Sequence, residues 1–218
     1  MIKRFDRIEG RYIEKIYGQE RLAFAHSDNT DFYDQTLWAE RGGHPGDILT
    51  FYDFTNGKVY QPFEKQHDVI YSEPSYAAGF YYFLQGNYSG NKITLYRYLP
   101  EEVLEAVTSF GFDEVELYNL RAAGNPIHVF SQNGAVFECY YPERISFPLA
   151  PHQTVTFIED GKVYLEEWVE EGWDDEHECE TEDYKFYNKV IVKDFAGNTL
   201  SEEVGFLFPA PDGTYWMA

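Results

Sequence analysis

The chain has 218 residues, of which 38 are acidic and 17 basic, giving a formal net charge of −21. A surface of this sign repels nucleic-acid phosphates and anionic lipid headgroups, which argues against nucleic acids and membranes as partners. Apolar residues make up 44% of the sequence and aromatic residues 19%. The chain can therefore bury a core, and its composition favours strands.

Cysteine content and the N-terminal sequence bear on the compartment. The two cysteines, Cys139 and Cys179, are too few for a disulfide scaffold and do not form a Cys-x-x-Cys motif, so both are expected to be reduced. The residues Met1–Arg7 lack the apolar core of a signal peptide, and no apolar run is long enough to span a membrane. These features predict a cytoplasmic protein.

In chain order, one unit recurs: an aromatic-rich strand, a tight turn and a second strand of alternating polarity. The strongest turn is Asn56-Gly57, because both residues of an Asn-Gly pair accept a positive φ. The predicted hairpins are Met1–Asp6 with Arg11–Tyr17, Asp47–Phe54 with Lys58–Phe63, Lys92–Leu99 with Val103–Phe110, Ala135–Tyr141 with Arg144–Leu149, and Tyr187–Phe195 with Thr199–Val204.

Two more strands fit after each hairpin. They are Arg21–Ser27 with Thr36–Arg41, Val69–Ala78 with Phe80–Asn87, Glu114–Ala123 with Ile127–Gln132, Thr154–Ile158 with Lys162–Val169, and Gly205–Pro209 with Thr214–Met217. Units of four strands repeated five times thus account for the whole chain, and regular repetition on this scale indicates a repeat architecture.

The sequence therefore predicts an all-β fold, a five-bladed β-propeller formed by residues 1–218 as a single domain. Each blade has four strands, and one blade is shared by the N- and C-terminal strands, which closes the ring and removes exposed sheet edges. A β-sandwich or a pair of small β domains remains the alternative. Within the third hairpin, Pro100–Val107 is rich in helix formers and could instead be a short helix.

Two segments resemble the blades of many propellers: Phe51–Tyr60, with its Asn-Gly turn, and Pro211–Trp216, with its Pro-Asp-Gly turn. The likeness is to the propeller superfamily as a whole. The Trp-Asp and Gly-Gly signatures of the WD and Kelch families are missing, so the resemblance carries no functional residues with it.

In a propeller, the innermost strands line a central channel and their first residues meet at one mouth. Four blades would place a carboxylate there, and these are the candidate ligand-binding residues: Glu20, Asp68, Asp113 and Glu203. Gathered like charges raise one another's pKa or recruit a cation. The competing interpretation is that an acid-rich chain places carboxylates in most of its surface loops.

A second candidate is the acidic stretch Glu166–Asp183, which holds eleven carboxylates and no Lys or Arg. It joins the second and third strands of the fourth unit. It could bind a cation or a basic partner, or be a solvated, mobile loop. His177 and Cys179 alone are too few to ligate structural zinc, and the calcium-loop order is absent, so no metal is assigned.

No catalytic motif stands out. The sequence has no Gly-x-Ser-x-Gly elbow, phosphate-binding glycine loop or His-Glu-x-x-His helix, so no cofactor is predicted and enzymatic activity stays open. The first hypothesis is a non-catalytic binding or scaffold protein that presents an acidic face to a basic protein or a cation. The alternative is a carbohydrate-binding or glycoside-hydrolase-like propeller that uses the channel-mouth carboxylates. The oligomeric state is open in both.

Overall fold

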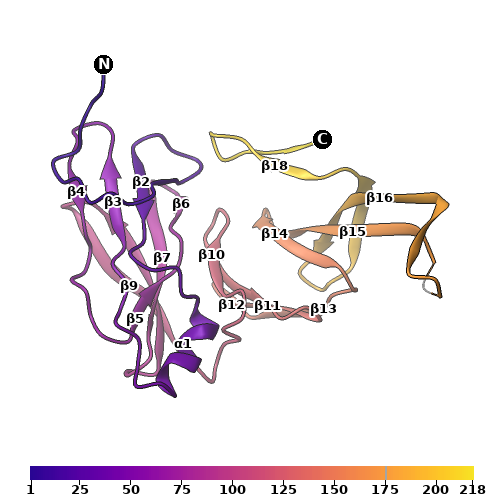
Figure 1. The fold of residues 1–218 in the computed structure, drawn as a ribbon, viewed down its shortest axis with the longest axis horizontal. Helices are drawn as coiled ribbons and strands as arrows, with labels where there is room; N and C mark the ends of the chain where they lie inside the picture. Colours follow the sequence, from indigo (N-terminus) through magenta and orange to yellow (C-terminus); the bar gives the residue numbers. More distant parts are fainter. Residues whose placement is uncertain (175) are drawn as a thin grey trace.

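A computed structural model describes residues 1–174 and 176–218, which form one short helix and nineteen strands (Figure 1). All strand pairs within the sheets are antiparallel, and the expected all-β class is confirmed. The helix has eight residues. Across the part of the chain described, no helix combines the length and apolar character needed to cross a lipid bilayer.

The first sheet has the order β1-β2-β3-β4, with β1 at Glu14–Lys15, β2 at Leu22–Ala25, β3 at Thr50–Asp53 and β4 at Val59–Tyr60. The Asn-Gly hairpin between β3 and β4 is confirmed: Gly57 has φ +78° and donates its N–H to the Asp53 carbonyl at 2.8 Å. The Asn56 side chain accepts from the Lys58 N–H at 2.8 Å, which fixes the turn.

Two expectations for the first hundred residues are wrong. The segment Thr36–Arg41 is not a strand, because Phe32–Ala39 forms helix α1. Asp31 caps this helix by accepting the Asp34 N–H at 2.8 Å, a signal typical of a helix start. The segment Arg11–Tyr17 contributes only β1, which belongs to the first sheet and not to a shared one.

The second sheet has the order β5-β7-β8-β9, and β6 also pairs with β7. Its strands are β5 (Val69–Tyr71), β6 (Ser75–Ala77), β7 (Phe80–Asn87), β8 (Lys92–Leu99) and β9 (Val103–Gly111). The bounds of β7 and β8 agree with those predicted. The alternative helix at Pro100–Val107 is wrong, since Val103 pairs with Leu99 across a tight turn.

The third and fourth sheets are plain four-stranded meanders in chain order. The third contains β10 (Arg121–Ala123), β11 (His128–Gln132), β12 (Val136–Tyr141) and β13 (Ile145–Pro148). The fourth contains β14 (Gln153–Glu159), β15 (Lys162–Asp174), β16 (Cys179–Asp194) and β17 (Thr199–Val204). These match the predicted strands, except that β10 is shorter, and β15 and β16 are much longer.

The fifth sheet is a hairpin of two strands, β18 (Leu207–Pro209) and β19 (Tyr215–Met217). The N- and C-terminal strands do not share a sheet as expected, because β19 pairs with β18 alone among the described strands. The N-terminal segment instead lies on the first sheet. Asp6 donates its N–H to the Gly57 carbonyl at 2.9 Å, and the Phe5 ring packs 5.1 Å from that of Tyr52.

The core lies between successive sheets. One cluster joins the first and second sheets around Phe51 and Phe83, a second joins the second and third around Leu84 and Val129, and the last joins the third and fourth around Phe137. Each of the first four sheets therefore packs on its neighbour in the chain, and Figure 1 shows the sheets arranged along a curve around a central space.

Candidate functional site

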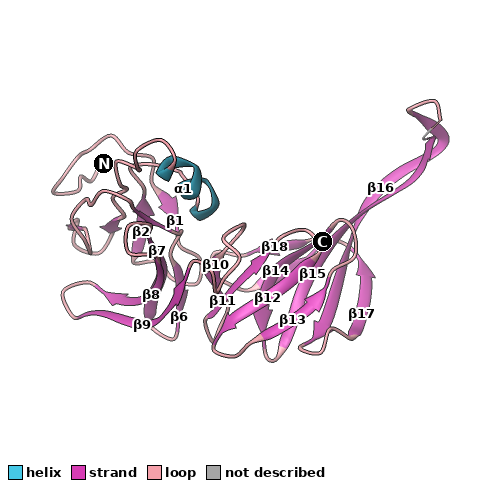
Figure 2. Ribbon diagram, turned by 90° about the horizontal axis from the view of Figure 1, so that it is seen from below, coloured by secondary structure: helices cyan, strands magenta, loops and turns pink. Residues whose placement is uncertain are grey.

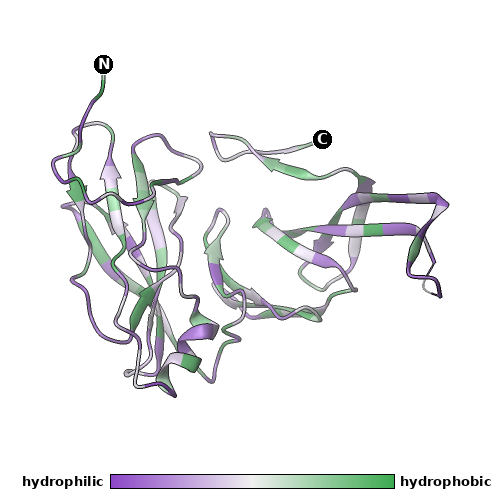
Figure 3. Cartoon of the chain, in the orientation of Figure 1, coloured by the Kyte–Doolittle hydropathy of each residue, from purple (hydrophilic) through white to green (hydrophobic). Residues whose placement is uncertain are grey.

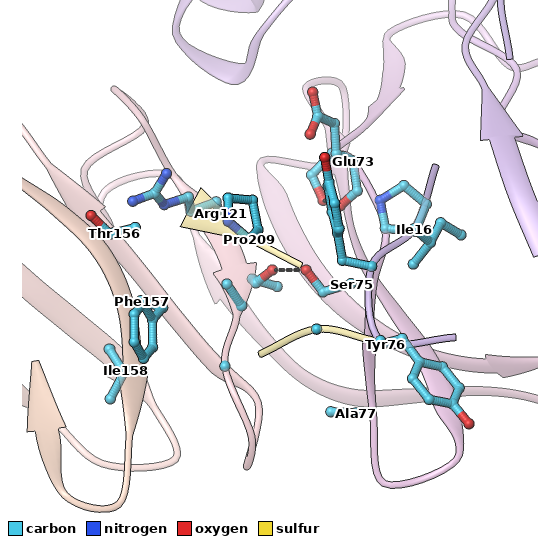
Figure 4. Close-up of a pocket in the computed structure, with 18 of the residues that line it drawn as sticks. Ile16, Glu73, Ser75, Tyr76, Ala77, Arg121, Thr156, Phe157, Ile158 and Pro209 are labelled. Carbon is cyan, nitrogen blue, oxygen red and sulfur yellow. Dashed lines mark hydrogen bonds between the residues drawn. The ribbon is translucent and has the colours of Figure 1, made fainter. Parts of the chain in front are cut away.

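A cavity of about 1350 Å³ lies between the sheets. All five sheets contribute residues to its lining, from strands β1, β2, β5, β6, β10, β14, β15, β16, β17, β18 and β19. Figure 4 shows side chains of different sheets facing one another across this space. A cavity of this size where several elements converge is where a small-molecule site is most often found.

One wall of the cavity is built around Arg121, the first residue of β10. Arg121 pairs with Phe130 on β11, and its guanidinium lies over that ring, 4.9 Å from the centroid. It also donates from an Nη to the Val155 carbonyl of β14. Beside this carbonyl, β14 has a bulge at Thr156. Bulges redirect side chains, and Figure 4 shows Thr156 beside Arg121.

Arg121 is an exposed residue on the cavity lining, and none of the ion pairs formed by residues 1–174 and 176–218 includes it. Burial among the surrounding protein atoms lowers the pKa of Arg121, an effect opposed by Tyr215 and Glu73. An arginine side chain nevertheless stays protonated at neutral pH. It therefore presents a positive charge without a partner carboxylate to the interior of a strongly acidic protein.

The rest of the lining includes seven carboxylates and eight aromatic rings. Its carboxylates are Glu14, Asp28, Asp31, Glu73, Glu159, Glu203 and Asp212, and besides Arg121 the only Lys or Arg on the lining is Lys15. The hydrogen bond from Thr30 lowers the pKa of Asp28, and that from Thr214 lowers the pKa of Asp212. The cavity thus offers many hydrogen-bond acceptors and has a negative overall charge.

The wall opposite Arg121 comes from β6 and from the residues just before it. Figure 4 shows Glu73, Ser75 and Tyr76 there. Ser75 donates its hydroxyl to the Ala122 carbonyl at 2.7 Å, which ties β6 of the second sheet to β10 of the third. The two walls are therefore held at a fixed separation by a hydrogen bond next to Arg121.

The C-terminal hairpin covers the remaining side of the cavity. Its Tyr215 ring stacks on Phe157 at 4.0 Å, and Phe157 stacks in turn on Tyr164 at 4.3 Å, so three parallel rings attach β19 to the fourth sheet. At its other end, the hairpin contacts the turn between β1 and β2. Gly18 donates its N–H to the Pro211 carbonyl at 3.3 Å.

Only a glycine fits at that second contact. Gly18 and Gly213 both have positive φ, and a Cβ on Gly213 would lie 2.7 Å from the Cα of Gly18. The two backbones are in close contact here, so the C-terminal hairpin touches the β1–β2 turn of the first sheet at one end and the fourth sheet at the other.

Of the four carboxylates expected to converge, Glu203 on β17 lies on the cavity lining. Glu20 lies in the turn between β1 and β2, and Asp113 in the loop after β9; both are exposed and neither is on the lining. The structure thus does not bring the four together.

The fourth, Asp68, is engaged within the protein. It accepts from the His44 N–H and the Ser89 hydroxyl, both at 2.7 Å, and lies 3.0 Å from His67. Burial would raise its pKa, but these hydrogen bonds outweigh burial and the pKa is lowered. Asp68 therefore holds three loops together and does not face the cavity.

Sequence reasoning missed Arg121. The sequence-based candidates were carboxylates at the starts of strands, whereas Arg121, the residue that distinguishes this cavity, is a cation. The available signal was a single arginine in an otherwise apolar or small-residue strand, Leu120–Ala123.

The acidic stretch Glu166–Asp183 joins β15 and β16, as expected, but it continues these strands and is not an irregular loop. Figure 2 shows the resulting two-stranded arm projecting from the fourth sheet, and Figure 3 shows that its outer part is mainly hydrophilic. Asp175, within this stretch, lies outside the described residues. Among the others, no group of three or more His, Cys, Asp or Glu side chains is placed to hold a metal ion.

The arm also exposes aromatic rings. Side chains alternate between the faces of a strand, and Glu170 pairs with Phe186, so Trp168, Tyr184 and Phe186 share one face of the arm. Phe186 is 66% exposed and Trp173, whose ring lies 6.1 Å from that of Tyr184, is 43% exposed. An aromatic surface of this kind has no other element packed on it among the described residues.

Comparisons of the chain with models of protein families, with curated proteins and with solved structures found no match.

Proposed function

We propose that this chain is a binding protein whose central cavity holds a small, hydroxyl-rich ligand such as a short oligosaccharide. The observation that carries the proposal is the cavity itself, because its lining combines carboxylate acceptors with aromatic rings. Carboxylates accept hydrogen bonds from ligand hydroxyls, and aromatic faces pack on the apolar C–H faces of a sugar ring. Tyr76 and Tyr215 lie on the lining in positions where they could supply such faces.

The fold that goes with this proposal is a five-bladed β-propeller, with the sheets as blades. Three observations support it: successive sheets pack on one another, every sheet reaches the same cavity, and the C-terminal hairpin contacts the first sheet. The fifth blade then consists of β18 and β19 alone.

Two of the cavity carboxylates are suited to bind a ligand and not to supply the acid of a hydrolysis. Glycoside hydrolysis needs one carboxyl group with a raised pKa to act as the acid. The two cavity carboxylates with shifted pKa values, Asp28 and Asp212, are shifted downward by their hydrogen bonds to Thr30 and Thr214. These two are hydrogen-bond acceptors and not acids.

The test is calorimetric titration with a panel of neutral sugars that includes glucose, lactose and maltose. We expect at least one to bind the wild type and to raise its unfolding temperature, because a ligand of the native state stabilises it. Tyr76→Ala should weaken that binding, whereas Tyr12→Ala, at an exposed position outside the cavity, should not. A panel that neither binds nor shifts unfolding would contradict the proposal.

A second binding function is favoured by the arm. We propose that it docks a basic protein surface, because a row of exposed aromatic rings lies among carboxylates there. Arginine and lysine side chains pack on aromatic faces and pair with carboxylates, so the two groups together select a cationic partner.

An arginine-rich peptide serves as the probe for the arm. The double variant Trp173→Ala/Phe186→Ala should bind it several-fold more weakly, while Phe54→Ala, which removes an equally exposed ring elsewhere, should not. Binding that depends on salt alone and ignores both changes would show that net charge, and not the arm, attracts the peptide.

A further inference from the structure

The arginine in the cavity narrows the class of ligand. Arg121 carries its charge at a fixed position, since Phe130 lies beneath the guanidinium and the Val155 carbonyl accepts from one Nη. A guanidinium has five N–H donors, and one accepted bond leaves the others unused by this contact. The accessible part of the group faces the cavity. This arrangement suits a planar anionic group, which two parallel N–H donors can bind together.

We infer that the ligand of the central cavity carries a single carboxylate and that Arg121 binds it. The inference rests on the proposed function, because it names the chemical class of the ligand for the same cavity. In carbohydrate terms, the structure points to a sugar acid: hydroxyls meet the carboxylates and rings of the lining, and the one acid group meets Arg121.

The negative charge of the lining limits how many anionic groups the ligand can carry. Seven carboxylates and Lys15 surround the arginine, so every negative charge placed away from Arg121 meets net repulsion. A monoanion places its only charge against the guanidinium. A phosphate monoester carries a charge between −1.5 and −2 at neutral pH, so part of its charge stays uncompensated. We therefore expect a carboxylate to be preferred over a phosphate.

The hydroxyl groups nearest to Arg121 also favour a carboxylate ligand. Thr156, at the bulge of β14, lies beside Arg121 in Figure 4, and its hydroxyl makes no hydrogen bond within the described protein. It could donate to the second oxygen of the same carboxylate. Ser75, in contrast, is already committed to the Ala122 carbonyl and holds the walls of the cavity.

Three sugars that differ only at C6 test the inference: glucose, glucuronate and glucose 6-phosphate. Affinities are measured by calorimetry, and the Nε–H resonance of Arg121 is followed by NMR. We expect glucuronate to bind about tenfold to a hundredfold more tightly than glucose, as one charge-assisted pair contributes. Glucose 6-phosphate should bind more weakly than glucuronate. The Arg121 resonance should shift with glucuronate and not with glucose.

Variants separate the role of Arg121 from its packing. Arg121→Gln should bring the ratio of the glucuronate affinity to the glucose affinity close to one, because the charge that selects the carboxylate is gone. Arg121→Lys should keep only part of the preference, because an ammonium lacks the planar pair of donors. Arg144→Gln is the matched control, since Arg144 also packs on a ring, that of Tyr140, and donates to a backbone carbonyl but lies outside the cavity lining.

The outcomes distinguish the inference from the function on which it rests. Equal affinity for glucose and glucuronate would overturn the inference and leave the proposed function standing. A preference for glucose 6-phosphate would also overturn it, in favour of a phosphate ligand. If none of the three sugars bound or moved the Arg121 resonance, the inference would fall, and if lactose and maltose also failed to bind, the proposed function would fall with it. The resonance is measured on the wild-type protein, so this result holds even where a variant does not fold.

Discussion

The first two sheets and the last two sheets differ in how they use their aromatic residues. In the first two, Phe51 and Phe83 are completely buried in one cluster of rings that both sheets share. In the last two, Trp216 and Phe186 are each 66% exposed, and every residue of β17 and β19 is exposed. Aromatic residues thus form a buried core in the first two sheets and part of the exposed surface in the last two.

This contrast separates the regions that stabilise the fold from those to which we assign the proposed binding functions. Burial of large side chains stabilises the fold, whereas exposed rings contribute little to it and are characteristic of binding surfaces. The early sheets therefore act as the support, while the later sheets supply the arm, the hairpin that covers the cavity and the bulge beside Arg121. Four changes test this division, in order of decreasing expected effect on stability.

The largest effect is expected in the early sheets. Phe83 is fully buried, and its ring packs against those of Phe51, Tyr71 and Tyr96. Phe83→Ala should lower the free energy of unfolding by about 3–5 kcal/mol, because it removes buried area and leaves a cavity. Urea denaturation measures this. A loss below about 1 kcal/mol would mean that the early sheets are not the support.

Acidification is expected to have the second largest effect on stability, through two carboxylates of the first sheet and its loops. Burial would raise the pKa of Asp47 and Asp53, but hydrogen bonds to His26 and Ser27, and to Thr55 and Arg21, outweigh it and lower both. A folded-state pKa below the unfolded value adds stability above the unfolded value of about 3.9. This stability is lost as the pH falls through the folded pKa.

Denaturant titrations at successive pH values should therefore show stability falling below about pH 4. Asp47→Asn should start less stable at neutral pH and lose less on acidification, because its side chain does not titrate. Parallel profiles for the two proteins would show that Asp47 makes no such contribution.

A moderate effect is expected at the hairpin. Tyr215 stacks on Phe157 at 4.0 Å, whereas its neighbour Trp216 is 66% exposed. Tyr215→Ala should cost about 1–2 kcal/mol, since a stacked pair contributes beyond its buried area. Trp216→Ala, although it removes a larger ring, should cost less than about 0.5 kcal/mol. A larger loss of stability for Trp216→Ala than for Tyr215→Ala would mean that the hairpin packs on the protein through the face that carries Trp216.

The smallest effect on stability is expected in the arm. Phe186→Ala should change the free energy of unfolding by less than about 0.5 kcal/mol, because the ring is exposed. The same change should weaken binding of the arginine-rich peptide. A variant that is clearly destabilised yet binds normally would make the ring structural and remove the arm from recognition.

Local signals explain why much of the strand pattern could be predicted. The Asn56-Gly57 pair fixes a hairpin through backbone geometry alone, and the bounds predicted for β7 and β8 agree with the structure to the residue. Helix α1 was missed because its aromatic residues favour strands by composition, although Asp31 at its start is a readable cap. Here a local hydrogen bond decided the structure where composition pointed elsewhere.

The site depended on contacts that periodicity does not encode. Whether Asp68 faces a channel or bonds to Ser89 is decided by loops distant in sequence, and the position of Arg121 depends on a bulge in β14. The N-terminal segment shows the same limit. Its apolar residues predict a strand, but Phe5 packs on Tyr52 of the first sheet and Met1–Asp6 pairs with no other strand among those described.

The most direct test of the central claim is amide chemical-shift mapping of the labelled protein during titration with glucuronate. The account predicts that shifts concentrate on residues of β6, β10, β14 and β19 around Arg121, and that the arm and the outer strands β4 and β13 stay unchanged. Shifts that concentrate on the arm or on the outer strands, with Arg121 and Thr156 unmoved, would contradict a ligand site at the centre of the sheets.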